Sequence, residues 1–506
     1  MKIALISPYA DITAYGVRCL SSYLKSRGHQ VKLIFLPDYR DEQDEFLTRP
    51  YLYTAELLAD ITAHCQGCGL IGISLMTFCF ERVAQLSDHL RQNLDIPVVW
   101  GGIHATIRPE ECLEHADFVC RGEGEEALAQ LAHTLETGQK PWDIANLSYK
   151  QDGRALHNPL APLVQDLDAY PLPDYDLEDH YYAPMAHPPL RRLTLGAFQA
   201  LMAANPLSHP ERGQIIYQTM ASRGCPYHCS YCCNNFLRQL YPGQKYVRFL
   251  GVDRLIAELR DIRTRFPFLT FVILSDDSFF SAPMTYLRQF AQAYEQEIGL
   301  PFRCLASPLA VTEAKLQLLT RVGLRVLQMG IQTGSESTRR LYKREASAAQ
   351  LIETGKLVAR FIPPLEPPRY DIIIDNPYES PADIVSTVRL LLDIPAPYKV
   401  HAFSLVFIPG TELHRRAAQD GLIEDEKRQI YRKQFHTPSN VYLKILLRLT
   451  GSRWPVPLLR LLAHPQLLTW FNLPLMRQLL NSLRRLKVSR WVRRQGSLTL
   501  KEKHQA

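Results

Sequence analysis

Short apolar runs alternate with amphipathic helical patterns along most of this chain. In the first 145 residues, a helical pattern at 16–27 and further helical stretches separate strand patterns at 2–7, 29–36, 69–74, 97–100 and 117–120. Strands joined in this way form a parallel, doubly wound sheet, which binds ligands outside the carboxyl ends of its strands. We therefore predict a Rossmann-like domain over residues 1–145, with glycines and small hydroxyl residues at those strand ends.

The same alternation resumes near residue 214. Strand patterns lie at 214–221, 271–275, 302–306, 326–330, 370–374 and 401–407, with helical patterns such as 252–266 and 314–322 between them. Six β/α units in this length predict a partial (β/α)6 barrel over residues 214–420. The intervening residues 146–213 are rich in Pro and Asp, and we predict that they form an interdomain linker.

Composition narrows the class of protein. Eleven cysteines in 506 residues are too sparse for a secreted disulfide scaffold. The sequence has no uncharged apolar run long enough for an ordinary membrane-spanning helix. The first eight residues are too short for a signal-peptide core and fit a β-strand better. A reducing cytoplasm is the expected location.

The overall charge of +7 hides a basic tail. Residues 427–506 carry 17 Lys and Arg and one Glu, a net charge of +16, whereas the remainder carries 41 basic and 50 acidic residues, a net charge of −9. The tail mixes its charges with Leu-rich stretches and with Trp454, Trp470 and Trp491, a composition that suits peripheral contact with the inner face of a membrane. The alternative is a C-terminal helical region, residues 421–506, that packs on the body. Prolines divide it into short helices.

The strongest chemical signal is the C-x3-C-x2-C pattern of Cys225, Cys229 and Cys232. Three thiolates in one loop can bind three irons of a [4Fe–4S] cluster and leave the fourth iron open. A zinc site would usually pair two cysteine knuckles, and the lone pair Cys65 and Cys68 is far away along the chain. Three buried structural thiols are the other alternative, but loops expose side chains more often than they bury them.

This loop, with Tyr231 before its last cysteine, resembles that of the radical S-adenosylmethionine (SAM) superfamily. Four further segments at or after the ends of predicted strands also resemble the family: 275–279 (SDDSF), 329–335 (MGIQTGS), 375–379 (DNPYE) and 408–413 (IPGTEL). The segment 375–379 lacks the two glycines of the family pattern. The resemblance implies SAM-binding roles for Tyr231, Asp276, Asp277, Gly330, Gln332, Thr333 and Ser335. Helix capping by the two aspartates and simple burial of Gln332 are the structural alternatives.

The first domain resembles the cobalamin (B12)-binding domain that precedes one class of radical SAM enzymes. The matching segments are 101–106 (GGIHAT) and 121–126 (RGEGEE). The resemblance implies cobalamin-binding roles for Ser74, Thr77, Gly101, Gly102, His104, Thr106, Gly122 and Glu123. Helix capping by Glu123 and a loop contact by His104 are the alternatives. Residues 11–16 (DITAYG) contain no histidine, so the resemblance implies base-off cobalamin without a His lower ligand.

Together the two resemblances imply a [4Fe–4S] cluster, SAM and cobalamin as cofactors. They imply a methyltransferase that uses a 5′-deoxyadenosyl radical and methylcobalamin to methylate an unactivated carbon of a small-molecule or lipid substrate. A flavodoxin or ferredoxin would donate single electrons, and no nucleic-acid partner is expected. A cyclase or rearrangement enzyme, acting on a tetrapyrrole or lipid, and a non-catalytic cobalamin or iron–sulfur sensor are the alternatives.

Overall fold

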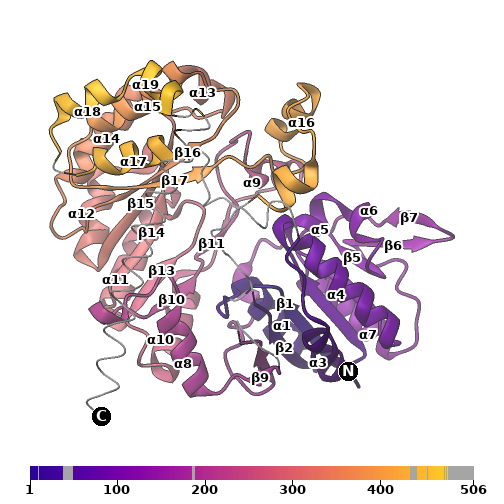
Figure 1. The fold of residues 1–506 in the computed structure, drawn as a ribbon. Helices are drawn as coiled ribbons and strands as arrows, with labels where there is room; N and C mark the ends of the chain where they lie inside the picture. Colours follow the sequence, from indigo (N-terminus) through magenta and orange to yellow (C-terminus); the bar gives the residue numbers. More distant parts are fainter. Residues whose placement is uncertain are drawn as a thin grey trace, which may run out of the picture. The chain divides into compact units, whose positions relative to one another are not determined.

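The computed structural model describes residues 1–473, except 10, 38–49, 185–188, 434–440, 453 and 472, together with residue 476. The chain forms two compact units (Figure 1). The first unit comprises Met1–Leu327 and Val406–Gln434, and the second comprises Gln328–Leu405 and Phe435–Ala506. We describe each unit by itself.

The first unit contains a nine-stranded sheet in the order β7-β6-β5-β4-β3-β1-β2-β8-β9. Its centre, β5 to β2, is parallel, with β1 between β3 and β2. The central elements are β1 (Lys2–Ser7), α1 (Tyr15–Ser26), β2 (Gln30–Phe35), α3 (Ala55–Cys65), β3 (Leu70–Ser74), α4 (Phe80–Asn93), β4 (Val98–Gly101), α5 (Ile103–Ile107), α6 (Pro109–Cys112), β5 (Phe118–Cys120) and α7 (Glu125–Glu136). This order confirms the doubly wound prediction.

Burial explains why these runs form strands and helices. β1 is buried from Ile3 onward, and Trp100 of β4 has no exposed surface, as continuous apolar runs inside a parallel sheet require. α1 packs against α7 and α3 packs against α4. The Thr54 side chain caps α3 by accepting a hydrogen bond from the backbone N–H of Leu57.

The segment predicted to be a linker also contributes to this sheet. β6 (Leu147–Gln151) and β7 (Arg154–His157) add an antiparallel hairpin beyond β5. β8 (His180–Tyr182) pairs in parallel with β2, and β9 (Arg191–Arg192) adds an antiparallel strand beyond it. The segment then forms helix α8 (Leu195–Ala204). Residues 146–213 therefore contain short strands and a helix that the sequence pattern did not indicate.

A second sheet has the strand order β10-β13-β14-β15-β16-β17. In the first unit it holds β10 (Ile216–Thr219), β13 (Phe271–Leu274) and β14 (Phe302–Ala306), which pair in parallel. The other elements of this part are β11 (Ser222–Arg223), α9 (Cys233–Gln239), β12 (Arg248–Phe249), α10 (Val252–Arg265), α11 (Met284–Glu297), α12 (Glu313–Arg321) and α16 (Glu412–Gln419).

The second unit continues the β/α alternation with β15 (Leu324–Gln332), which begins in the first unit, β16 (Arg369–Ile374) and β17 (Lys399–Ser404), again paired in parallel. Its helices are α13 (Glu336–Leu341), α14 (Ala348–Ala359), α15 (Pro381–Leu392), α17 (Val441–Thr450), α18 (Val456–Leu462) and α19 (Pro465–Phe471). Complete capping boxes begin α14 at Ser347 and α15 at Ser380. Six parallel β/α strands confirm the partial-barrel prediction.

Candidate functional site

The three cysteines of the sequence motif lie on one loop between β11 and α9. Gly224 gives this loop its entry turn, because its φ is +89° and a Cβ there would lie 2.6 Å from the carbonyl oxygen of Tyr246. Within the loop, the N–H of Cys232 donates to the carbonyl of Cys229 at 3.2 Å. The Arg238 guanidinium donates to the carbonyl oxygen of Cys225 and lies 5.3 Å from the Tyr246 ring centre. The loop is thus fixed at both ends.

The thiols suit an iron–sulfur cluster better than a single ion. Cys229 is buried, Cys225 and Cys232 are half-buried, and none of them forms a disulfide. Four thiolates about 2.3 Å from one zinc ion would lie within about 4 Å of each other. Among the described residues, the three sulfur atoms of Cys225, Cys229 and Cys232 do not form a group in which all atoms lie within 4.8 Å of one another. Three separated thiols on one loop fit the cluster ligand set.

The two electrostatic extremes of the loop are Cys232 and Cys225. A hydrogen bond with Cys233 lowers the pKa of the Cys232 thiol to about 7, whereas burial raises the pKa of the Cys225 thiol to about 12. The nearby carboxylate of Asp277 also favours the protonated form of both thiols. The Asp277 side chain is accessible to solvent, but the protein atoms around it partly desolvate its carboxyl group and raise its pKa. The half-buried Tyr231 lies between the last two cysteines.

Asp276, the other aspartate after β13, has a different position. Its carboxylate is fully buried and accepts hydrogen bonds from the backbone N–H of Ala221 at 3.0 Å and from the Ser222 hydroxyl. Burial raises its pKa to about 6. Asp276 therefore joins the end of β13 to the start of the cysteine-bearing segment, while only Asp277 is open to a ligand.

The remaining predicted SAM residues lie in the second unit, at the end of β15. The carbonyl of Gly330 accepts a hydrogen bond from Arg344 at 2.5 Å, and Gln332 has a positive φ of 69°. The Thr333 hydroxyl, fully buried, donates to Glu379 at 3.1 Å, and the Ser335 hydroxyl donates to Asp383 at 2.5 Å. Burial raises the pKa of Glu379 to about 7. These residues form one polar turn.

A cavity of about 350 Å³ opens at the carboxyl ends of β1, β3 and β4 in the first unit. Its position between β1 and β3 is the point where the strand order reverses, which is where doubly wound sheets bind ligands. Five predicted cobalamin residues line it: Ser74, Gly101, Gly102, Gly122 and Glu123. The opposite wall comes from the start of the barrel and includes Met220, Ser222, Arg223, Leu250 and Arg254.

Two glycine turns at the cavity cannot carry a side chain. Gly102 has a φ of +92°, and a Cβ there would lie 2.8 Å from the carbonyl oxygen of Leu75. Gly122 has a φ of +79°, and a Cβ there would lie 2.0 Å from the Tyr241 hydroxyl. Thr106 holds the two turns together, because its hydroxyl donates to the Gly102 carbonyl at 2.9 Å and accepts from the Gly122 N–H at 3.0 Å.

Thr77 and His104 do not line the cavity. His104 is fully buried, its Nδ1 lies 3.1 Å from the Thr77 hydroxyl and its Nε2 lies 3.5 Å from a Glu111 oxygen. The rings of Phe80 and Tyr431 pack against the imidazole at 5.0 and 5.4 Å. These contacts favour the loop-contact alternative for His104, and a cobalamin contact by either residue remains a prediction.

Glu123 forms an ion-pair network that the sequence did not reveal. Arg248 is buried and donates to both Glu123 oxygens, at 3.0 and 2.7 Å, while Arg223 donates to Glu123 at 3.2 Å and also to Glu125. Burial raises the pKa of Glu123, but the two guanidinium groups outweigh this effect and hold it below the ordinary value. Arg223 directly precedes the cysteine loop, so this network joins the loop to the cavity wall.

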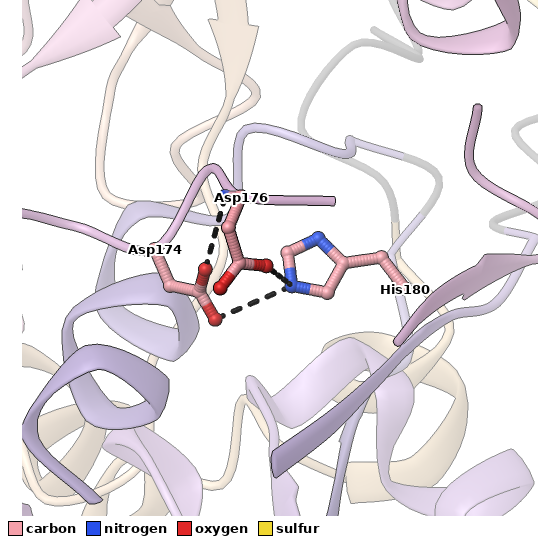
Figure 2. Close-up of side chains that lie close together, drawn as sticks. All are labelled: Asp174, Asp176 and His180. Atoms are coloured by element: carbon pink, nitrogen blue, oxygen red, sulfur yellow. Dashed lines mark hydrogen bonds and ion pairs between the residues drawn. The ribbon is translucent and has the colours of Figure 1, made fainter. Parts of the chain in front are cut away.

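A separate cluster of Asp174, Asp176 and His180 lies outside these sites (Figure 2). His180 Nε2 lies 3.3 Å from Asp174 and 3.6 Å from Asp176, within reach of a shared cation. The Lys25 ammonium already contacts both carboxylates, at 2.7 and 2.6 Å. The cluster is therefore a structural ion-pair group with its own cation.

Two family models match separate parts of the chain. Residues 1–132 match the B12 binding domain, and residues 220–391 match the Radical SAM superfamily. The fold and the cysteine loop thus define a radical SAM protein with a cobalamin-binding domain in front. The chain belongs to this family, as the sequence predicted, and it is an enzyme of the radical SAM class.

Named relatives agree with this assignment. The chain is 25% identical over 363 residues to "Uncharacterized methyltransferase PH0819" of Pyrococcus horikoshii, covering 70% of each protein. It is 28% identical over 233 residues to the anaerobic magnesium-protoporphyrin IX monomethyl ester cyclase of Synechocystis, covering 44% of this chain but 38% of that enzyme. Among solved structures, the radical SAM methyltransferase TsrM of Kitasatospora setae superposes with a TM-score of 0.62 at 15% identity, covering 83% of this chain and 76% of TsrM. This last likeness concerns the fold.

Proposed function

We propose that this protein is a cobalamin-dependent radical SAM methyltransferase that methylates an unactivated carbon of a small molecule. The observation that carries the proposal is the joining of two sites in one unit. Arg223 lines the cavity at the β1/β3 crevice and directly precedes the cysteine loop, and it binds Glu123 on the opposite wall. Enzymes with two cofactors need such a rigid connection, since the reacting groups must be held in register.

The residues present fit the implied cofactors. Cys225, Cys229 and Cys232 would hold the cluster, and the cavity, with apolar walls and the two glycine turns, would take the nucleotide tail of cobalamin. No histidine lines this cavity, whose walls are formed by described residues, in keeping with cobalamin that lacks a His lower ligand. When bound, these groups would supply the radical that removes a hydrogen atom and the methyl group that replaces it.

The protein's own residues provide position and electrostatics. The carboxylate of Asp277 is exposed beside the cysteine loop and could hold the amino group of SAM. Arg223 and Arg254 line the cavity wall, where Glu123 and Glu125 balance the charge of Arg223, and the buried apolar strands β1 and β3 keep water from its floor. A flavodoxin or ferredoxin as electron donor belongs to the same proposal.

A cyclase or rearrangement enzyme is the second candidate. The similarity to the anaerobic magnesium-protoporphyrin IX monomethyl ester cyclase of Synechocystis favours it. The two candidates differ in product, because a methyltransferase forms S-adenosylhomocysteine and adds the mass of one CH₂ group to its substrate. A cyclase adds no such mass.

The test is anaerobic incubation of reconstituted protein with methylcobalamin, SAM, reductant and candidate substrates. Cys229→Ala should abolish 5′-deoxyadenosine formation and lower the iron content, because it removes a cluster ligand. Cys68→Ala is the matched control, since it removes a cysteine far from the C-x3-C-x2-C pattern along the chain and should retain both properties. A Cys229→Ala protein that still cleaves SAM would refute the ligand assignment, and a new product without added methyl mass would refute methylation.

A further inference from the structure

Helices α17, α18 and α19 form the outer layer of the second unit. They contact one another and pack on α15 (Figure 1). Their inward side chains are buried, including Leu446 and Leu447 of α17, Leu459 of α18 and Leu468 of α19. The Tyr442 and Phe471 rings stack at 4.4 Å between α17 and α19. The packing is therefore complete on one side of this layer.

The segment that forms this layer also exposes large apolar side chains. Thirteen large hydrophobic side chains are exposed in the described part of the chain, and seven of them lie between residues 445 and 473. We name these seven the exposed apolar set: Ile445, Trp454, Val456, Leu458, Leu461, Trp470 and Leu473, with exposures from 40% to 71%. Such a concentration in one short segment marks a contact surface, since singly scattered apolar residues would not gather there.

The chain segment that carries this set has charged residues of one sign. No Asp or Glu occurs in residues 427–501. Arg448 is exposed one turn after Ile445 on α17, and Arg460 pairs with Asp393 of the same unit. The sequence of residues 474–506 adds nine Lys and Arg residues and one Glu. A partner that covers the set must therefore be compatible with dense positive charge.

We propose that the exposed apolar set and the basic residues around it dock this enzyme on an anionic lipid bilayer. A second copy that docks through this same surface, or residues 474–506 of the same chain, would bring positive charge onto positive charge. An anionic bilayer instead offers negative headgroups to Lys and Arg and an apolar boundary to Trp and Leu. Apolar insertion and a basic patch are the two signals that stable peripheral binding requires. None of the described helices is long and apolar enough to cross a membrane, so the contact is with the surface. This inference does not depend on the proposed reaction.

The experiment is flotation of the full chain with vesicles of phosphatidylcholine, with and without phosphatidylglycerol. The wild type should float with the anionic vesicles and less with phosphatidylcholine alone. Raising the salt from about 0.1 M to about 1 M shortens the Debye length from about 10 Å to about 3 Å and should weaken binding. The combined variant Trp454→Ser, Leu461→Ser and Trp470→Ser should lower the lipid-bound fraction at least about tenfold, because it removes three inserted apolar side chains.

Leu195→Ser is the matched control. Leu195 lies on α8 of the first unit and is 55% exposed, so its loss should leave flotation unchanged. Circular dichroism and elution volume should be the same for all variants, since each replaced side chain is exposed. Equal flotation of wild type and triple variant would overturn the proposal. The proposal would also be overturned if the wild type did not float with any vesicle. The same holds if the wild type bound no vesicles but formed a dimer and the triple variant were a monomer.

Discussion

Replacing Glu123 by glutamine should weaken the first unit strongly. Glu123 presents both carboxylate oxygens to Arg248, whose side chain is 3% exposed, and one of them also to Arg223. A glutamine keeps one acceptor oxygen but turns an N–H₂ group toward a guanidinium group that also only donates. The change therefore leaves a buried positive charge without its counterion and adds a donor–donor contact.

The expected magnitude follows from this burial. Removing one partner of a buried ion pair costs about 3–5 kcal/mol. Glu123 itself is 21% exposed, and the Val164 carbonyl still accepts from Arg248 at 2.8 Å, so the loss should lie at or just below the lower end of that range. We expect a loss of about 2–3 kcal/mol, which corresponds to a factor of about 30–150 in the folding equilibrium.

The assay is guanidinium unfolding of the anaerobically purified protein, with Glu126→Gln as control. Glu126 belongs to the same sequence motif but pairs with Arg27 on the surface, where both side chains are more than half exposed. Exposed pairs contribute about 0–1 kcal/mol. The midpoint of Glu123→Gln should fall clearly below that of the control, at an unchanged m-value. Equal midpoints for the two variants would refute the reasoning.

Acidic pH should remove the difference in stability between the wild type and Glu123→Gln. The folded-state pKa of Glu123 lies below its ordinary value, so its ionised form stabilises the protein above the unfolded-state pKa, and that stability is lost as the pH falls through the folded-state pKa. The gap between wild type and Glu123→Gln should therefore be full at neutral pH and close in strongly acidic solution.

Three other perturbations have defined outcomes. Gly122→Ala should lower both the cobalamin affinity and the stability, because the new methyl group meets the Tyr241 hydroxyl. Gly138→Ala, also at positive φ but in open space, should leave the affinity unchanged. Cobalamin titration measures the affinity, and thermal unfolding measures the stability. Glu379→Gln should flatten a loss of stability as pH rises from about 4.5 to about 7, because over that range the carboxyl ionises in the unfolded chain while burial keeps it protonated in the folded protein; denaturant midpoints at several pH values test this. Thr106→Val should raise the cobalamin dissociation constant several-fold by freeing the two glycine turns, while Thr137→Val on the exposed end of α7 should not.

The sequence located most strands because long apolar runs are a local signal. The predicted strand 302–306 coincides with β14, and β1 matches its predicted range. The strands within residues 146–213 were not predicted, because β8 has three residues and β9 has two, too few to show a period. These short strands form because β8 hydrogen-bonds to the edge of β2, and β9 then hydrogen-bonds to the edge of β8.

The candidate site also has parts that the sequence predicted and parts that it did not. The cysteine loop was predictable because its ligand spacing is local. The pairing of Glu123 with Arg248 joins residues 125 positions apart, which no local pattern encodes. His104 occupies a motif position, but the fold buries it between Phe80 and Tyr431, and sequence reasoning could not distinguish a buried ring from a ligand contact.

The two pairs of short strands at the edges of the nine-stranded sheet, β6 with β7 and β8 with β9, affect how the protein can be handled. β7 on one side and β9 on the other end the sheet with short, charged strands that carry Arg154, Arg191 and Arg192. Such ends discourage edge-to-edge aggregation. A fragment cut at residue 145 would lose both pairs and leave β5 and β2 with unpaired backbone groups. Exposed strand edges promote aggregation, so we expect a cobalamin-binding fragment to stay in solution better when it extends through residue 192.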